Sequence, residues 1–329
     1  ARRPLADHVH VRPSRAADLA RLARLQSRTA VGLVLAGGGA RGLAHLGVLR
    51  ALHERGIEVD LVGGTSIGAV IGVYAASDRP LDLVMASARR AFARNPTGDY
   101  NLLPLLSLLK GQRLRQVARD TARDLFGFDA DVEDLWKGYY CIASNVTRAR
   151  EEVLRHGALE HAVLASVAIP GALPPVLHHG ELLCDGGTFN NFPADVMRGQ
   201  RGIGRVIGVD LSAGERKPLA ISELPGTWAL LRDRLRRPSR RRYRLPSLAS
   251  YLMNVTVLYS LSRQLQARGL TDLYFNPPLQ RVGMLDWRRF DQIVEQGYAH
   301  AVEVLDAAGQ AAPAPAVIGA DAVVADTRA

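Results

Sequence analysis

The sequence predicts an α/β protein with a mainly parallel central sheet and helices on both faces, a three-layer α/β/α arrangement. A strand–glycine–helix unit occurs twice in succession: residues 31–36 are apolar and precede GGGARG at 37–42, and residues 57–62 precede GGTSIG at 63–68. Consecutive units of this kind place their strands parallel and their helices on the sheet faces. The 329 residues, 47% of them hydrophobic and 22% charged, are enough to build a substantial core.

The chain is expected to divide into three parts. Residues 1–28 include Leu19, Leu22 and Leu25 at every third position, which predicts a thin amphipathic helix. Because the chain begins at Ala1 without an initiator Met or a signal peptide, we interpret residues 1–28 as a connector from a missing N-terminal, regulatory region. Residues 29–307 are expected to form the catalytic domain, and residues 308–329, with their Ala-Pro repeats, a disordered tail.

Periodicity and turn residues predict the remaining elements. Helices are expected after each glycine loop, to about residues 56 and 76, after Pro80, and over residues 112–126, 159–167, 246–268 and 286–307. Further strands are expected over residues 139–143, 152–155, 181–184, 205–211 and 272–275. Residues 212–245, rich in Pro and Arg, are expected to form a long excursion.

Composition limits the function classes. The net charge is +10, and residues 232–244 hold eight Arg and one Asp, so the basicity is local and predicts no nucleic-acid partner. Cys141 and Cys184 are too few for a disulfide framework or a four-thiolate metal site, which favours a reducing, cytoplasmic location. The most apolar stretch, residues 61–76, is shorter than the ~20 residues of a membrane span.

The first glycine loop has three interpretations. Gly37, Gly39 and Gly42 match G-x-G-x-x-G, and Asp60 follows near the end of the next predicted strand, as in a dinucleotide-binding oxidoreductase. The same glycines suit an ordinary tight turn. Their exposed backbone N–H groups at a helix start also suit an oxyanion hole.

The second loop predicts a nucleophile. Residues 64–68 form G-x-S-x-G between a predicted strand and a predicted helix, which is the context of a nucleophile elbow. The tight turn requires nearly side-chain-free positions at Gly64 and Gly68 and exposes the hydroxyl of Ser66. With a second glycine-rich loop just upstream, this favours a serine hydrolase.

The base that activates Ser66 has two candidates. One is a triad of Ser66, Asp210 and His300, but His300 falls within a helical pattern. His45 lies behind the glycine loop, where packing is expected. Residues 178–179, the pair His178 and His179, suit a turn.

The other candidate is Asp185, at the end of a predicted strand. Gly186 and Gly187 follow it, and they free the backbone to bring the carboxylate against Ser66 in a Ser-Asp dyad. Asp-Gly is also ordinary turn chemistry. No His, Cys and carboxylate cluster has metal-ligand spacing, so neither metal nor other cofactor is expected.

These motifs together resemble the patatin-like phospholipases, a family with a Ser-Asp dyad and no catalytic His. The resemblance rests on GGGARG at 37–42, GTSIG at 64–68 and DGG at 185–187. SVAIP at 166–170, DGGTFNNFP at 185–193 and FDQIVEQGY at 290–298 look like the bacterial branch of the neuropathy target esterase group. Members often carry cyclic-nucleotide-binding modules upstream, and the leading segment is similar to the connector that follows them.

The resemblance, which covers about residues 29–306, implies a role for each motif residue. Ser66 is the expected nucleophile and Asp185 the expected general base. The oxyanion hole is expected to involve Gly37, Gly38, Gly39 and Gly42, with Arg41 supporting that loop. The implied function is that of a serine lipid acyl hydrolase that cleaves glycerophospholipids or lysophospholipids through an acyl-enzyme.

Two segments suit a peripheral membrane enzyme. Residues 100–110 contain six Leu and a Pro and are either an acyl-chain entrance or a core segment. The arginines of residues 232–244 either attract anionic headgroups or form a solvated loop. A dinucleotide-binding oxidoreductase and a catalytically silent lipid-binding module are the rival hypotheses.

Overall fold

An eight-stranded sheet lies at the centre of the computed structural model of the protein, which describes residues 8–93, 95–212, 221–236, 242–243, 245 and 248–311. The strands are β1 (Ala30–Leu35), β2 (Leu61–Thr65), β3 (Gly138–Asn145), β4 (Arg150–Leu154), β5 (Val176–His178), β6 (Glu181–Asp185), β7 (Ile203–Val209) and β8 (Leu273–Phe275). Hydrogen-bonded pairing links them in the order β5-β6-β3-β2-β1-β7-β8, and β4 also pairs with β3. Strands β3, β2, β1, β7 and β8 pair in parallel, whereas β4 and β6 each pair antiparallel with β3 and β5 pairs antiparallel with β6, so the predicted mainly parallel sheet is confirmed.

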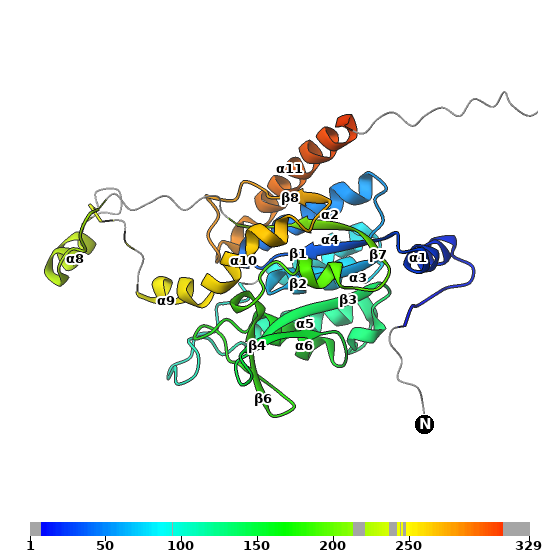
Figure 1. Ribbon diagram of the computed structural model, residues 1–329. Coiled ribbons are helices and arrows are strands. Elements are labelled where there is room, and N and C mark those ends of the chain that lie inside the picture. Colours follow the sequence, from blue (N-terminus) through cyan, green and yellow to red (C-terminus); the bar gives the residue numbers. More distant parts are fainter. Residues whose placement is uncertain are drawn as a thin grey trace, which may run out of the picture.

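Helices cover both faces of this sheet (Figure 1). They are α1 (Ala16–Ser27), α2 (Ala44–Glu54), α3 (Ile67–Ala76), α4 (Leu81–Ala93), α5 (Gln112–Phe126), α6 (Leu159–Val167), α7 (Ala194–Arg198), α8 (Thr227–Arg234), α9 (Leu248–Thr256), α10 (Leu258–Arg268) and α11 (Phe290–Ala311). Short 3₁₀ turns are η1 (Gly39–Leu43), η2 (Val132–Asp134), η3 (Gly186–Thr188) and η5 (Trp287–Arg289).

Alternation along β1 separates two cores. Leu33 and Leu35 belong to the larger core, which includes residues of α2, α3, α6 and α11. Val34 packs on the opposite face in a smaller core with Phe192 and Met197. Because successive side chains of a strand point to opposite faces, a fully apolar strand such as β1 requires a layer on each side. The three-layer prediction is therefore confirmed.

The second strand differs from its prediction. It begins at Leu61 instead of residue 57 and continues through Gly63 and Gly64. A Cβ at Gly63 would overlap the ring of Tyr140, so this part of the strand lies under a neighbouring side chain and needs glycine for that reason. Asp60 therefore precedes the strand, where its carboxylate accepts the Val31 N–H at 2.9 Å.

Other differences from the predicted elements are an interrupted helix, a longer last helix and elements that were not predicted. The single helix expected over residues 246–268 is interrupted at Val257, whose φ of −107° and ψ of 5° separate α9 from α10. Strand β5 and helices α7 and α8 were not predicted. Helix α11 continues to Ala311, so the first residues of the expected tail are helical, and residues 312–329 lie outside the described part of the chain.

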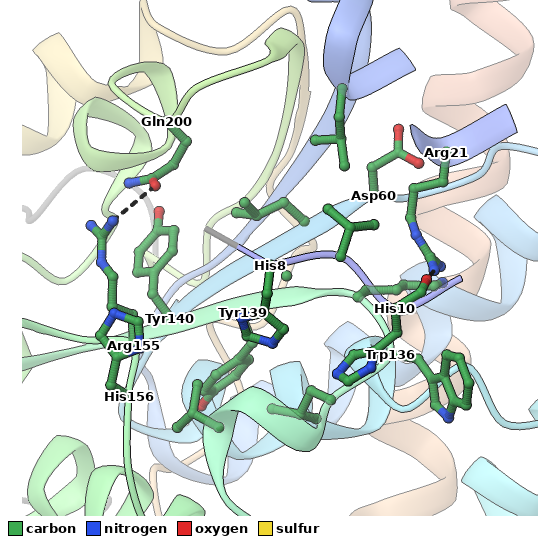
Figure 2. Close-up of a pocket in the computed structure, with 17 residues that line it drawn as sticks. His8, His10, Arg21, Asp60, Trp136, Tyr139, Tyr140, Arg155, His156 and Gln200 are labelled. Atoms are coloured by element: carbon green, nitrogen blue, oxygen red, sulfur yellow. Dashed lines mark hydrogen bonds between the residues drawn. The ribbon is translucent and has the colours of Figure 1, made fainter. Parts of the chain in front are cut away.

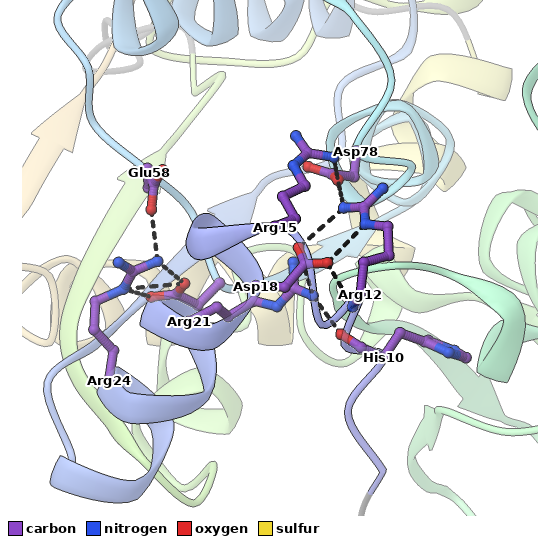
Figure 3. Close-up of polar contacts among 9 residues, drawn as sticks. His10, Arg12, Arg15, Asp18, Arg21, Arg24, Glu58 and Asp78 are labelled. Carbon is purple, nitrogen blue, oxygen red and sulfur yellow. Dashed lines mark hydrogen bonds and ion pairs between the residues drawn. The ribbon is translucent and has the colours of Figure 1, made fainter.

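Helix α1 buries charged side chains, whereas its predicted leucine stripe is only partly covered, with Leu22 and Leu25 half-buried. Leu19 is exposed, whereas Asp18 and Arg21 are buried. Arg12 donates to the Asp18 carboxylate at 2.6 Å, and this hydrogen bond lowers the pKa of Asp18. Arg24 of α1 pairs with Asp60 at 2.6 Å. It also pairs with Glu58 at 2.7 Å (Figure 3). The expected connector is thus tied by ion pairs to the amino end of the sheet.

The two segments suggested for a membrane surface have different outcomes. Of the six leucines in residues 100–110, Leu109 is buried and the other five are exposed, so the core interpretation is wrong for those five. In the basic segment 232–244, Arg236 pairs with Asp233, whose carboxylate also accepts backbone N–H groups of residues 242 and 243. Arg237, Arg240, Arg241 and Arg244 lie outside the described residues.

Candidate active site

Ser66 stands on a sharp turn between β2 and α3. Its φ of 55° and ψ of −123° are unusual for a residue with a side chain, and such strain is typical of a nucleophile elbow. A Cβ at Gly68 would overlap the carbonyl of Leu35 at the end of β1. A Cβ at Gly64 would in turn overlap the backbone of Gly68. Both glycines are therefore required by close backbone approach, as the motif predicts.

Strand β3 brings Asp185 to this turn. Thr65 at the end of β2 pairs with Ile142, and Asp185 at the end of β6 pairs with Ala143, the next residue of β3. Strand β4 pairs with residues 141–145 and so occupies one edge of β3. Each residue of β3 that pairs with β4 also pairs with either β2 or β6. Strands β2 and β6 therefore both lie along the other edge of β3. They meet where Ser66 follows Thr65.

The carboxylate of Asp185 is buried and oriented toward Ser66. It accepts the Gly187 N–H at 2.7 Å. Burial raises the pKa of Asp185 to about 6, although the Gly187 N–H and the Ser66 side chain act to lower it. A Cβ at Gly187 would come within 3.0 Å of Asp185 Oδ1, so glycine at that position makes room for the carboxylate. A base of this pKa is mostly ionised at neutral pH and can accept a hydroxyl proton.

The carboxyl end of α6 accepts hydrogen bonds from the backbone N–H groups of Ser66 and Asp185. The Ser166 hydroxyl accepts the Ser66 N–H at 2.9 Å and donates to the Ile142 carbonyl at 2.6 Å. The Ala168 carbonyl accepts the Asp185 N–H at 2.9 Å. Sequence reasoning assigned no role to Ser166; the available signal was a serine in an otherwise apolar helix end within SVAIP.

The first glycine loop lies beside Ser66. A Cβ at Gly37 would come within 3.1 Å of the Ser66 Cβ. The Gly37 N–H donates to the Asn191 carbonyl at 3.2 Å, and the Asn191 side chain donates back to the Gly37 carbonyl at 3.1 Å. Two hydrogen bonds to Asn191 therefore hold Gly37 in place, and its N–H is not free to bind an oxyanion. Asn191 is a further residue that the sequence did not single out.

The remaining residues of this loop either anchor it to neighbouring segments or carry N–H groups that could bind an oxyanion. The Ala40 N–H donates to Met284, and Arg41 Nε donates to the Val282 carbonyl at 2.8 Å, which fastens the loop to residues 282–284. A Cβ at Gly42 would overlap Ile67 at the start of α3. Among the described residues, no hydrogen bond uses the N–H of Gly38 or Gly39, so these two remain available to an oxyanion.

The histidines proposed for a triad have other partners. His300 Nε2 accepts the Asn276 N–H at 3.0 Å, while Asp210 accepts the Tyr274 hydroxyl at 2.7 Å. His45 is fully buried against the Ala36 carbonyl at 2.9 Å, and burial lowers its pKa to about 4, which keeps it neutral.

The paired histidines lie at another edge of the sheet. His178 contacts His161 at 3.2 Å, and its ring lies 4.3 Å from that of His179. In the described part of the chain, no group of three His, Cys, Asp or Glu side chains is arranged to hold a metal ion. Both cysteines, Cys141 and Cys184, are free and buried.

The position of Asp60 argues against a dinucleotide site. A ribose-binding acid belongs at the carboxyl ends of the strands, near the glycine loop. Asp60 precedes β2 at the amino end, where Arg24 and the Val31 N–H occupy its carboxylate. The expectation that it ends a strand was wrong because β2 begins after it.

Two cavities lie at this opposite end of the sheet. One, of about 70 Å³, is lined by His8, His10, Trp136 and Lys137 among others (Figure 2). The second, of about 470 Å³, lies along α1 and shares Asp60 and Lys137 with the first. Neither includes a residue of the three motifs.

The chain is similar to known proteins of one family. The family model described as patatin-like phospholipase matches residues 33–198. Lysophospholipase NTE1 of Kluyveromyces lactis is 35% identical over 88% of this chain and 20% of its own length. Neuropathy target esterase sws of Drosophila melanogaster is 34% identical over 87% of this chain and 20% of its own length. The chain thus spans about a fifth of these relatives.

VipD from Legionella pneumophila aligns with 85% of this chain and 67% of its own, at a TM-score of 0.43 and 16% identity.

Proposed function

Because the chain belongs to the patatin-like phospholipase family, we propose that it is a serine acyl hydrolase that cleaves ester bonds of glycerophospholipids or lysophospholipids through a Ser66–Asp185 dyad. The relatives named lysophospholipase support this substrate class. The observation that supports the mechanism is that the ends of β2 and β6 meet on β3, which brings the buried Asp185 carboxylate to the Ser66 turn, where the Ser66 side chain acts to lower its pKa.

The proposed reaction begins with the nucleophile. Ser66 Oγ attacks the ester carbonyl carbon while Asp185 accepts the hydroxyl proton. The carbonyl oxygen becomes an oxyanion, which accepts hydrogen bonds from the N–H groups of Gly38 and Gly39 near the amino end of α3. The C–O bond to the leaving alcohol breaks, and that alcohol takes the proton from Asp185, leaving acyl-Ser66.

Deacylation repeats these steps with water. A water molecule attacks the acyl carbon as Asp185 accepts one of its protons. The second tetrahedral intermediate collapses, the fatty acid leaves, and Ser66 Oγ regains its proton from Asp185. No step requires a metal or an organic cofactor, because the base is a carboxylate and the oxyanion has backbone donors.

A substrate panel tests the proposal. Wild type and Ser66→Ala are compared on phosphatidylcholine, lysophosphatidylcholine and a short soluble ester, with fatty-acid release as the readout. We expect Ser66→Ala to fold like the wild type and to retain under about one part in 10³ of its turnover. Retention of more than a few per cent, or wild-type cleavage of none of the lipids, would refute the function.

A further inference from the structure

Residues 100–109 form a projecting hairpin with an apolar exterior. Tyr100 and Leu109 pair as an isolated antiparallel bridge, and the Asn101 N–H donates to the Leu108 carbonyl at 2.9 Å. Between these bonds, the leucines at 102, 103, 105 and 106 are 94%, 78%, 90% and 76% exposed. So many adjacent, nearly fully exposed leucines on one loop mark an interaction surface and not ordinary surface variation.

The polar side chains of this hairpin point inward. Ser107 is buried, and its hydroxyl donates to the Leu109 carbonyl at 2.7 Å. The Asn101 amide donates to the Ser107 and Leu109 carbonyls at 2.8 and 3.1 Å. Loops in contact with water ordinarily show the opposite arrangement, with polar side chains outward. The hairpin therefore satisfies its polar side chains internally and leaves the leucines at 102, 103, 105 and 106 largely exposed.

The base of the hairpin is joined to the candidate active site. The Leu108 and Leu109 N–H groups donate to the carbonyls of Gly171 and Ala172, each at 2.9 Å. These carbonyls belong to the segment that follows Ala168, whose own carbonyl accepts the Asp185 N–H. The hairpin and helix α9 both extend from the side of the molecule toward which the parallel strands end (Figure 1).

We propose that this hairpin enters a lipid surface and places its leucines among the outer acyl-chain segments, beside the mouth of the active site. Binding to a lipid surface is argued from the residues of the hairpin alone. Only the idea that the bound lipid is also the substrate rests on the proposed function. A convex ridge of leucines suits a fluid acyl phase, which needs no complementary groove. The cation Lys110 follows the ridge and is exposed, as contact with phosphate headgroups requires.

Vesicle binding tests this surface directly. The full chain carrying Ser66→Ala, which leaves the lipid uncleaved, is sedimented with phosphatidylcholine vesicles and with phosphatidylcholine vesicles containing phosphatidylglycerol. We expect Leu102→Asp with Leu105→Asp to weaken binding at least about tenfold, because burial of each leucine is lost. The matched control is Leu83→Asp with Leu265→Asp, which changes two exposed leucines on α4 and α10 and should bind as the parent does.

The outcomes separate the rival occupants. Equal vesicle binding by the hairpin variant and the control, or no binding by the parent chain, would overturn the proposal. Ultracentrifugation without lipid covers the case of a second copy: a parent dimer that the hairpin variant converts to monomer would also overturn it.

The same variants separate this proposal from the function. With Ser66 intact, the hairpin variant should hydrolyse a short soluble ester at the wild-type rate, since the leucines lie outside the catalytic contacts. If wild type showed no ester turnover, the proposed function would fail while the vesicle result still decided the surface.

Discussion

Ser166 holds the backbone of Ser66 in place through a hydroxyl that is bonded on both sides. It accepts the Ser66 N–H at 2.9 Å and donates to the Ile142 carbonyl at 2.6 Å, with no exposed surface of its own. Ile142 is also the β3 partner of Thr65, so one short network links the nucleophile turn to the strand that positions Asp185. We infer that Ser166 is a positioning residue that maintains the strained turn.

Ser166→Ala should therefore lower kcat on a soluble ester by roughly 10- to 100-fold with little change in KM. The Ser66 N–H would lose its buried acceptor, which typically costs about 1–3 kcal/mol. Ser144→Ala is the matched control, because Ser144 is equally buried but its hydroxyl has no hydrogen-bond partner among the described residues. Equal kcat values for the two variants would remove the positioning role.

Asp185→Asn should cost about 10²- to 10⁴-fold in turnover, because the amide preserves shape but accepts no proton. His300→Gln should stay within a few-fold of wild type, since His300 bonds to Asn276 and not to the dyad. Soluble-ester kinetics and circular dichroism on each variant provide the check. A folded but inactive His300→Gln, beside an active Asp185→Asn, would favour a His-based triad instead.

The pH profile should follow the ionisation of Asp185. Its pKa in the folded protein is about 6, and only the carboxylate can act as the base. We expect kcat/KM on a soluble ester to rise with pH through about 6 and to level off above pH 7. A profile that is flat from about pH 5 to 8 would contradict the assignment of the base.

The ionisation of Asp185 that activity requires should lower the stability of the folded protein. Because burial raises the pKa of Asp185, the folded state binds the proton more tightly than the unfolded state, and the free energy of unfolding falls as pH rises from about 4 to 6. Asp185→Asn removes this loss. Its stability advantage over wild type should grow from near zero at pH 4 to as much as about 3 kcal/mol at pH 7. Denaturant unfolding at both pH values tests this, and a constant difference would contradict it.

Gly68→Ala should disrupt the elbow even though it adds a single methyl group. That Cβ would overlap the Leu35 carbonyl, so β1 or α3 must shift, at a cost on the order of 1–3 kcal/mol with a large loss of turnover. Gly309→Ala is the control, since no atom lies within 4 Å of its Cβ position and alanine favours helix α11. Comparable thermal stability and activity in the two variants would argue against the steric requirement.

Local chemistry was the part of the site that could be predicted. The demand for glycine at residues 64 and 68 arises within one turn, and the run of apolar residues before it marks a buried strand. Helices α5 and α6 were predicted at their observed bounds, because their patterns end at Gly127 and near Pro170. Strand β2 was misplaced, because Gly63 and Gly64, which suggest a loop, belong to the extended strand, with Gly63 beneath the ring of Tyr140.

The sequence by itself determined that Ser66 stands on an elbow, since the five residues of that turn carry their own steric requirement. It left open whether Asp185 or a histidine is the base, because that choice depends on which groups share the elbow in space. Tertiary structure favours Asp185, because β2 and β6 meet along one edge of β3, whereas Asp210 and His300 have other partners. Burial by that packing, and not the local sequence, also raises the pKa of Asp185 toward neutrality.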